Sequence, residues 1–362
     1  MGYKENLEMN EYTYKTKPFL HQEEVLQKCW DKKTYAFFME MGTGKSKVLI
    51  DNLAILHEKR KINGALIVAP KGVDRIDHSV ICWTPTPNKK QKALLDSLSV
   101  FSEKLKIFLI NVEALSTTKG YTAALDFLKN HATMMAVDES TTIKSPTATR
   151  TKSAIKLGIH AKYRRILTGS PVTKSPLDLY TQCGFLSEEL LGYTSFWAFK
   201  SRYALMAQRN AAGGAHTYQH IIKYIRLDEL NEKLENFSSR ILKEDCLDLP
   251  EKLYTKRFIE LTKEQQKAYQ EMKQFAIAEL EGDTMTAFSG LTQMMRLHQI
   301  TCGHMTTDDG KVVDIKNNRI KELLNFLDET DGKIIIWANY RHDIQTITKE
   351  LENKYGTQTA CI

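Results

Sequence analysis

Residues 39–46 read Met-Glu-Met-Gly-Thr-Gly-Lys-Ser and directly follow the apolar run 35–38. A strand that runs into a Gly-Lys-Ser turn and then into a helix is typical of loops that hold nucleotide phosphates. Gly42 and Gly44, on either side of Thr43, can adopt backbone angles closed to other residues, so peptide N–H groups can close on phosphate oxygens. Lys45 supplies a positive charge, and the Ser46 hydroxyl suits Mg²⁺. The stretch therefore predicts a binding loop for ATP or a close relative.

One position departs from the strict eight-residue pattern, which begins with Gly where this chain has Met39. A short Gly-Lys-Ser also occurs in ordinary surface turns, so the motif needs a strand–turn–helix context. That context is present, because Val48, Leu49 and Leu53 follow the lysine with helical spacing. We therefore prefer the phosphate loop to the ordinary turn.

A second apolar run, 132–137, ends in Asp138-Glu139. An aspartate at the tip of a buried strand can hold magnesium through water, and an adjacent glutamate can orient and deprotonate the attacking water. Surface turns often carry such a pair as well. Its position after a phosphate loop favours the catalytic interpretation.

Five blocks stand in an order that resembles the SWI/SNF-type DNA translocase branch of helicase superfamily two. They are Gln22, Gly-Thr-Gly-Lys-Ser (42–46), Val-Ala-Pro-Lys (68–71), Asp-Glu-Ser-Thr-Thr-Ile-Lys-Ser (138–145) and Leu-Thr-Gly-Ser-Pro-Val (167–172). The second motif of that family is typically Asp-Glu-Ala-His, and here Ser140 and Thr141 replace Ala-His. Later blocks at 240–252, 261–269, 295–304 and 333–340 also resemble the family, so the likeness runs from about residue 17 to the last residue.

The resemblance implies an ATP site with magnesium as cofactor. It assigns Gln22 to the adenine edge, although a glutamine in this setting would by itself be an ordinary helix-surface residue. Lys45 and Ser46 are assigned to phosphates and magnesium, Asp138 to magnesium, and Glu139 to the catalytic water.

The resemblance also implies double-stranded DNA as the partner. Pro70, Lys71 and the segment from Asn111 to Glu113 each follow an apolar strand and resemble the family's segments that follow a phosphate backbone. Thr168 and Ser170 would couple nucleotide state to DNA contact. Branched or single-stranded DNA and an unidentified protein partner stay open.

The expected architecture is α/β, with a RecA-like, doubly wound parallel sheet as its main lobe. We place this ATP-binding lobe at 1–180, a helical protrusion and connection at 181–249, and a helical segment with the beginning of a second RecA-like lobe at 250–362. Lys333–Ala338 is expected to be the opening strand of that second lobe, and 208–215 a mobile loop. The basic residues of the protrusion could contact DNA phosphates, but a solvated basic face is the simpler account; they are Lys200, Arg202, Arg209, His216, His220, Lys223 and Arg226.

The family's second lobe carries paired arginines well beyond its opening strand, and this sequence ends at Ile362 before such a block. An arginine that reaches the departing phosphate is worth roughly a thousandfold or more in rate. We therefore expect nucleotide binding with poor hydrolysis from these residues alone. Two classes stay open: an ATP-driven translocase on duplex DNA, with a strand-separating helicase as a variant, and a nucleotide-gated DNA-binding module that needs a partner or a missing lobe for turnover.

Composition agrees with a motor protein that does not enter a membrane. The net charge of +7 favours an acidic partner such as nucleic acid, and no run approaches the roughly 20 apolar residues needed to span a bilayer. Six cysteines without a close-spaced pair suit a reducing compartment, so we expect a cytoplasmic protein, or a nuclear one in a eukaryote. A bacterial or viral role fits such a compact motor better. His298, Cys302 and His304 lack the fourth ligand of a closed zinc site.

Overall fold

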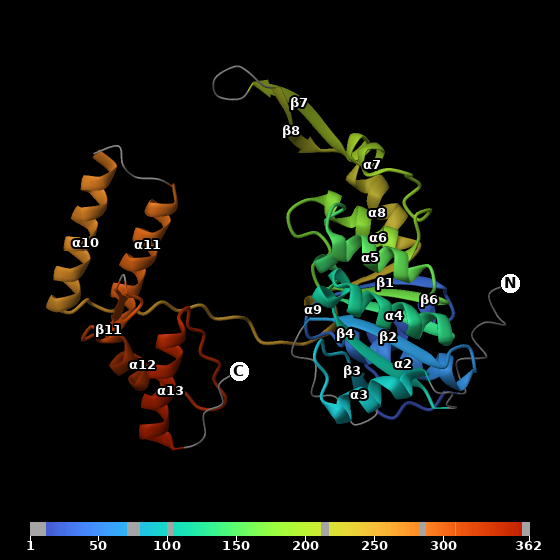
Figure 1. Ribbon diagram of the computed structural model, residues 1–362, viewed down its shortest axis with the longest axis horizontal. Helices are drawn as coiled ribbons and strands as arrows, with labels where there is room; N and C mark the ends of the chain where they lie inside the picture. Colours follow the sequence, from blue (N-terminus) through green and yellow to red (C-terminus); the bar gives the residue numbers. More distant parts are fainter. Residues whose placement is uncertain are drawn as a thin grey trace. The chain divides into compact units, whose positions relative to one another are not determined.

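Seven parallel strands form one sheet in the first of two compact units, Met1–Pro250 and Glu251–Ile362 (Figure 1). The structure is a computed structural model that describes residues 12–70, 80–99, 104–210, 217–281, 287–307 and 309–356. In spatial order the strands are β3 (Val80–Cys82), β4 (Lys106–Asn111), β2 (Gly64–Ala69), β5 (Thr133–Asp138), β6 (Tyr163–Leu167), β1 (Thr34–Met39) and β9 (Ser238–Ile241). The predicted α/β class with a parallel sheet is confirmed.

Both faces of this sheet are covered, which explains why its strands are nearly continuous apolar runs. Met134 and Met135 of β5 point to opposite faces and belong to two separate hydrophobic clusters. One face packs against α1 (Leu20–Cys29) and α2 (Lys45–Glu58). The other face packs against α4 (Thr118–Asn130), α5 (Thr149–Gly158) and α6 (Leu179–Leu186). Other short elements of the unit are α3 (Lys89–Asp96), α9 (Lys243–Cys246) and the 3₁₀ turns η1 (Ser97–Ser99), η2 (Val112–Ser116), η3 (Ser140–Ile143) and η4 (Pro176–Asp178).

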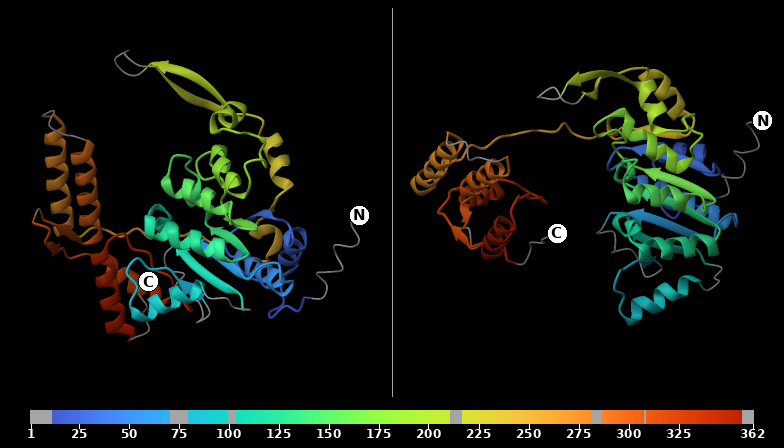
Figure 2. Two further views of the ribbon diagram at one scale, coloured as in Figure 1. Left: turned by 45° about the vertical axis from the view of Figure 1, so that its right-hand side comes forward. Right: turned by 45° about the horizontal axis from the view of Figure 1, so that its top comes forward.

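The protrusion between β6 and β9 differs from the expected helical segment. It contains an antiparallel hairpin, β7 (Ala204–Asn210) and β8 (Thr217–Tyr224), between α7 (Phe196–Tyr203) and α8 (Leu227–Glu235). The hairpin extends away from α7 and α8, as Figures 1 and 2 show. The sequence of β8 is rich in β-branched and aromatic residues, which pack well on a pleated surface once a partner strand is available. Residues 208–210 of the expected loop belong to β7, and 211–215 lie outside the described residues.

The described residues of the second unit form two helix pairs and one small antiparallel sheet. Its elements are α10 (Lys263–Glu281), α11 (Ala287–Cys302), β10 (His304–Thr306), β11 (Val312–Asp314), α12 (Arg319–Asp328) and α13 (Arg341–Tyr355). The expected strand Lys333–Ala338 is not formed. A strand needs a hydrogen-bonded neighbour, and in the described part of this unit β10 and β11 pair only with each other. Ile335 and Trp337 therefore stay 79% and 90% exposed.

None of the helices in the described residues has the length and apolar character to cross a membrane.

A fully buried arginine joins three elements of the first unit. From β6, Arg165 donates through Nε to Asn52 Oδ1 of α2 at 3.0 Å and through Nη2 to the Cys29 carbonyl at the end of α1 at 3.0 Å. Its Nη1 donates to the Lys33 carbonyl, just before β1, at 3.3 Å. Burial lowers the pKa of Arg165. The guanidinium therefore fixes the helices that carry Gln22 and Lys45 to the sheet.

We predict that Arg165→Leu lowers the free energy of unfolding by about 3 kcal/mol or more, because several buried acceptors lose their donor at once. Urea denaturation followed by circular dichroism measures the change. Lys129→Leu, on the exposed last turn of α4, is the control and should shift the transition little. Equal transitions for the two variants would contradict a structural role for Arg165.

Candidate nucleotide and DNA site

Strand register brings the sequence motifs to one edge of the sheet. Asp138 at the end of β5 pairs with Leu167 of β6, and Leu167 pairs with Phe37 of β1. β1 ends at Met39, immediately before the glycine loop, and Thr168 follows β6 directly. The loop, the Asp138-Glu139 pair and the Thr168 segment therefore lie at neighbouring strand ends.

The loop has the backbone geometry expected of a phosphate cradle. Gly42 and Gly44 have φ angles of 88° and 91°, and α2 begins at Lys45, so the free N–H groups of its first turn face the loop. Thr43 is buried, and its backbone N–H and its hydroxyl both donate to the Glu40 carbonyl, at 3.2 and 2.7 Å. The Thr43 hydroxyl therefore holds the loop closed.

Gln22 is buried against the loop and is not a surface residue of α1. Its Nε2 donates to the Thr43 carbonyl at 3.0 Å, and its Oε1 accepts from the Phe19 backbone N–H at 3.1 Å. The neighbouring His21 places Nε2 2.8 Å from the same Thr43 carbonyl. Since an amide offers two donors and two acceptor lone pairs, these two bonds use one of each and leave Gln22 chemically able to pair with the edge of a base.

The acidic pair is held in a defined geometry. Asp138 Oδ1 accepts the Glu139 N–H at 3.0 Å, and Glu139 adopts a left-handed conformation with φ 48°. Burial raises the pKa of Asp138, while the Glu139 N–H and the charge of Lys45 oppose that rise. Thr168 Oγ1 donates to Glu139 Oε2 at 3.3 Å and accepts the Ser170 N–H at 3.2 Å. Thr168 thus links the glutamate to the following loop.

Sequence reasoning missed Gln182, a fully buried residue of α6. Its Oε1 accepts from the Ser140 hydroxyl at 2.7 Å, and its Nε2 donates to the carbonyls of Pro171 and Asp178, both at 2.8 Å. Gln182 therefore ties the acidic motif to the Thr-Gly-Ser-Pro loop. No local pattern marks this residue, because its partners come from distant segments.

The segment after β9 also reaches the site. The Lys243 N–H donates to Glu40 Oε2 at 2.8 Å, and Arg240 Nη1 donates to the Gly169 carbonyl at 2.9 Å. A Cβ added at Gly42 would lie 3.2 Å from Lys243 Cε. Two residues of the block 240–252 therefore contact the site: Lys243 lies against the glycine loop, and Arg240 against the Thr-Gly-Ser loop. In the sequence, only its family likeness marks this block.

Two of the expected DNA-contacting residues line a common hollow. Pro70 and Asn111, at the ends of β2 and β4, border a cavity of about 410 Å³ together with Trp83 and Gln91. The Asn111 side chain accepts the Ala114 N–H at 3.0 Å, so it caps η2. Glu113 is exposed on η2 and carries a negative charge, and Lys71 lies outside the described residues.

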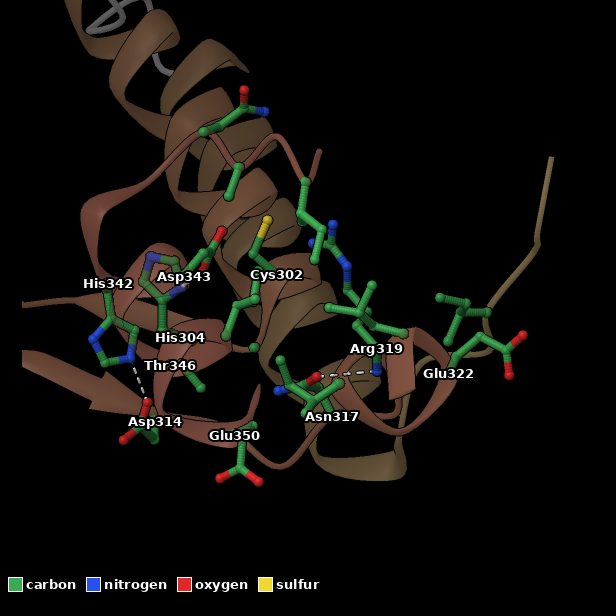
Figure 3. A pocket seen from close by; sticks show the side chains of 18 of the residues that line it. Cys302, His304, Asp314, Asn317, Arg319, Glu322, His342, Asp343, Thr346 and Glu350 are labelled. Carbon is green, nitrogen blue, oxygen red and sulfur yellow. Dashed lines mark hydrogen bonds and ion pairs between the residues drawn. The ribbon is translucent and has the colours of Figure 1, made fainter. Parts of the chain in front are cut away.

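A larger cavity of about 710 Å³ lies in the second unit, beside the unpaired segment 336–339 (Figure 3). Two pairs of its polar side chains lie close together: His304 Nδ1 is 3.0 Å from Asp343 Oδ1, and His342 Nε2 is 2.6 Å from Asp314 Oδ1. Within the described ranges, no three His, Cys, Asp or Glu side chains are grouped to hold a metal ion. The residues that line this cavity do not include the glycine loop or the Asp138-Glu139 pair, which belong to the first unit.

The residues of the first-unit site fit a magnesium nucleotide. The glycine loop and the N-terminus of α2 offer N–H donors, and Lys45 offers a cation close enough to act on the Asp138 carboxyl. Ser46 is exposed in the first turn of α2, and its oxygen and that of Asp138 are the hard ligands that Mg²⁺ prefers.

We predict that Gly44→Ala lowers ATP affinity about tenfold or more, since a left-handed backbone disfavours alanine by about 1–2 kcal/mol. The added Cβ would also lie only 2.2 Å from Gln22 Nε2 and displace it. Gly184→Ala is the matched control, because a Cβ on that α6 glycine meets nothing within 4 Å. Calorimetric titration compares the two, and equal affinities would contradict the cradle.

The partly buried Asp138 carboxyl should make the stability of the fold depend on pH. Because burial raises its pKa, the ionised carboxylate destabilises the folded state above that pKa, and the cost disappears below the ordinary value, where the group is protonated in both states. Asp138→Asn should therefore raise the free energy of unfolding at pH 7, and the gain should shrink as the pH falls through the raised pKa. Urea denaturation across this pH range tests the prediction, with Asp126→Asn as the control because Asp126 is exposed on the outer side of α4. A gain independent of pH would contradict the burial argument.

The sequence is similar to proteins of a known family. A family model for the SNF2-related domain matches residues 21–306. The helicase-like transcription factor of Mus musculus is 29% identical over 182 residues, which is 48% of this chain and 17% of that protein. An uncharacterized ATP-dependent helicase of Mycoplasma genitalium is 26% identical over 226 residues, 61% of this chain and 20% of that protein. The chain thus spans about a fifth of the length of these curated relatives.

Among solved structures, the SWI2/SNF2 ATPase core of Sulfolobus solfataricus in complex with double-stranded DNA aligns with a TM-score of 0.50 at 20% identity. The alignment covers 96% of this chain and 72% of that one, and the likeness shows a shared RecA-like fold. Since the family model spans most of the sequence, this chain belongs to the SNF2-related domain family of helicase superfamily two.

Proposed function

We propose that this chain is the ATP-binding motor of a DNA-dependent ATPase that translocates on double-stranded DNA. The observation that carries the proposal is the meeting of the glycine loop, Asp138-Glu139 and Thr168 at neighbouring strand ends. Family membership supports it, as does the structure of the Sulfolobus solfataricus relative in complex with double-stranded DNA.

In the proposed mechanism, each residue of the site has a separate task. Gln22 binds the adenine edge, while Lys45 and the α2 N-terminus bind the phosphates. When bound, Mg²⁺ would be held by Ser46 and Asp138 and would neutralise phosphate charge. Glu139 orients the attacking water and accepts its proton, and the Thr168 hydroxyl at 3.3 Å keeps the carboxylate in place.

DNA contact in this proposal is coupled to the site through Thr168 and Ser170. The Thr168 hydroxyl donates to Glu139 and accepts the Ser170 N–H. A movement of the Glu139 carboxylate would therefore shift the Thr-Gly-Ser loop through this pair of hydrogen bonds. Pro70, Lys71 and the backbone from Asn111 to Glu113 follow one DNA strand. Because the Glu113 carboxylate repels phosphates, only the backbone of that residue suits such a contact.

A second candidate is a nucleotide-gated DNA-binding module with little turnover of its own. It is favoured by the second unit, whose described residues form no parallel sheet and leave Lys333–Ala338 unpaired. An arginine that completes the site would then come from other residues, and without one the rate falls roughly a thousandfold.

One set of assays tests both candidates: ATP binding and hydrolysis by this chain, with and without duplex DNA. Lys45→Ala should abolish nucleotide binding and is the blank. Glu139→Gln should keep the binding affinity and lower hydrolysis about a hundredfold or more, because the general base is lost.

DNA-stimulated turnover above the blank supports the translocase, and tight binding without turnover supports the gated module. If the chain does not bind ATP, both candidates fail. Unimpaired turnover in Glu139→Gln would remove that residue from the role of water activation.

A further inference from the structure

The protrusion carries an unusual charge distribution. Residues 190–227 contain no Asp or Glu, although 44 of the 362 residues in the chain are acidic, and a stretch of this length would ordinarily hold several. The same stretch carries five cations, namely Lys200, Arg202, Arg209, Lys223 and Arg226. It coincides with α7, the β7–β8 hairpin and the turn into α8.

The base of the hairpin is firmly anchored, so its position on the unit is defined. Tyr203 is fully buried, and its hydroxyl donates to Glu229 Oε1 of α8 at 2.9 Å. Ile221 and Tyr224 of β8 pack against the hydrophobic cluster of the sheet face. Arg202 forms an ion pair with Glu229, so this cation has a structural partner.

Three other cations of the protrusion are available to a partner. Lys223 and Arg226 are exposed, and Lys200 Nζ stands 5.0 Å from the centre of the Trp197 ring, which is itself 64% exposed. Within the described residues, none of these three cations has a carboxylate at ion-pair distance. Exposed Leu205 and Ile222 lie on the same hairpin. We call Lys200, Lys223 and Arg226 the hairpin patch.

We propose that the hairpin patch is a second DNA-contacting surface, which binds backbone phosphates of the duplex separately from the strand ends that carry Pro70 and Asn111. The inference rests on the proposed function, because it takes duplex DNA as the partner. Among the described residues these three cations have no carboxylate at ion-pair distance, and Lys200 lies beside the exposed Trp197 ring, so they match the chemistry of a phosphate backbone. A two-stranded ribbon is also narrow enough to enter the major groove.

The test measures the binding of the full chain to a fluorescently labelled DNA duplex by anisotropy over a range of salt concentrations. The variant Lys223→Ser/Arg226→Ser should bind more weakly, and the slope of log K against log salt should fall by about 2, close to one for each lost phosphate contact. Its affinity for ATP should be unchanged, which shows that the unit is folded.

The matched control is Lys129→Ser/Lys156→Ser. It removes the same two charges from exposed last turns of α4 and α5, at the opposite edge of the sheet from the site. Its salt slope should stay at the value of the unaltered chain.

The outcomes separate this inference from the proposed function. If the unaltered chain binds DNA and both double variants keep its affinity and slope, the hairpin patch serves another acidic partner and the inference is overturned. An equal loss in both variants also overturns it, since the effect then reflects net charge alone. If the unaltered chain binds no duplex, the proposed function fails together with the inference.

Discussion

The parallel register of β5, β6 and β1 is the constraint on which the site depends. It places Asp138, Leu167 and Phe37 in one row, so three loops that are far apart in the sequence leave the sheet side by side. A shift of one residue in any of these strands would turn its apolar side chains to the other face. The two hydrophobic clusters that fill those faces therefore fix the position of the carboxylate as firmly as they fix the fold.

The parts of the site that a sequence can predict are those whose requirements are local. Gly42 and Gly44 are needed where the backbone takes positive φ, and Asp138 follows a buried strand, so each leaves a mark within a few residues. Gln22 and Gln182 leave no such mark. Each amide acts through carbonyls or hydroxyls contributed by other elements, with Ser140 lying 42 positions from Gln182, and only the folded chain brings them together.

The fold shows the same limit for strands outside the main sheet. The segments 217–224 and 333–338 are both rich in β-branched and aromatic residues, yet only the first forms a strand. β8 finds β7 a few residues earlier, whereas 333–338 has no neighbour among the described residues of its unit. Helical spacing led to the prediction of a helical protrusion, where the chain forms a hairpin. Apolar character led to the prediction of a strand at Lys333–Ala338, where no neighbouring strand is present among the described residues.

The ladder between β9 and β1 has a mechanical consequence. The chain that leaves the first unit passes through β9, where the Ile241 carbonyl accepts the Glu40 N–H at 2.9 Å and the Lys243 N–H grips the Glu40 carboxylate at 2.8 Å. Tension applied along this exit is resisted by a row of parallel-strand hydrogen bonds that must shear together. Glu40 is separated from Gly42 by one residue, so the backbone that would carry this tension is almost continuous with the glycine loop.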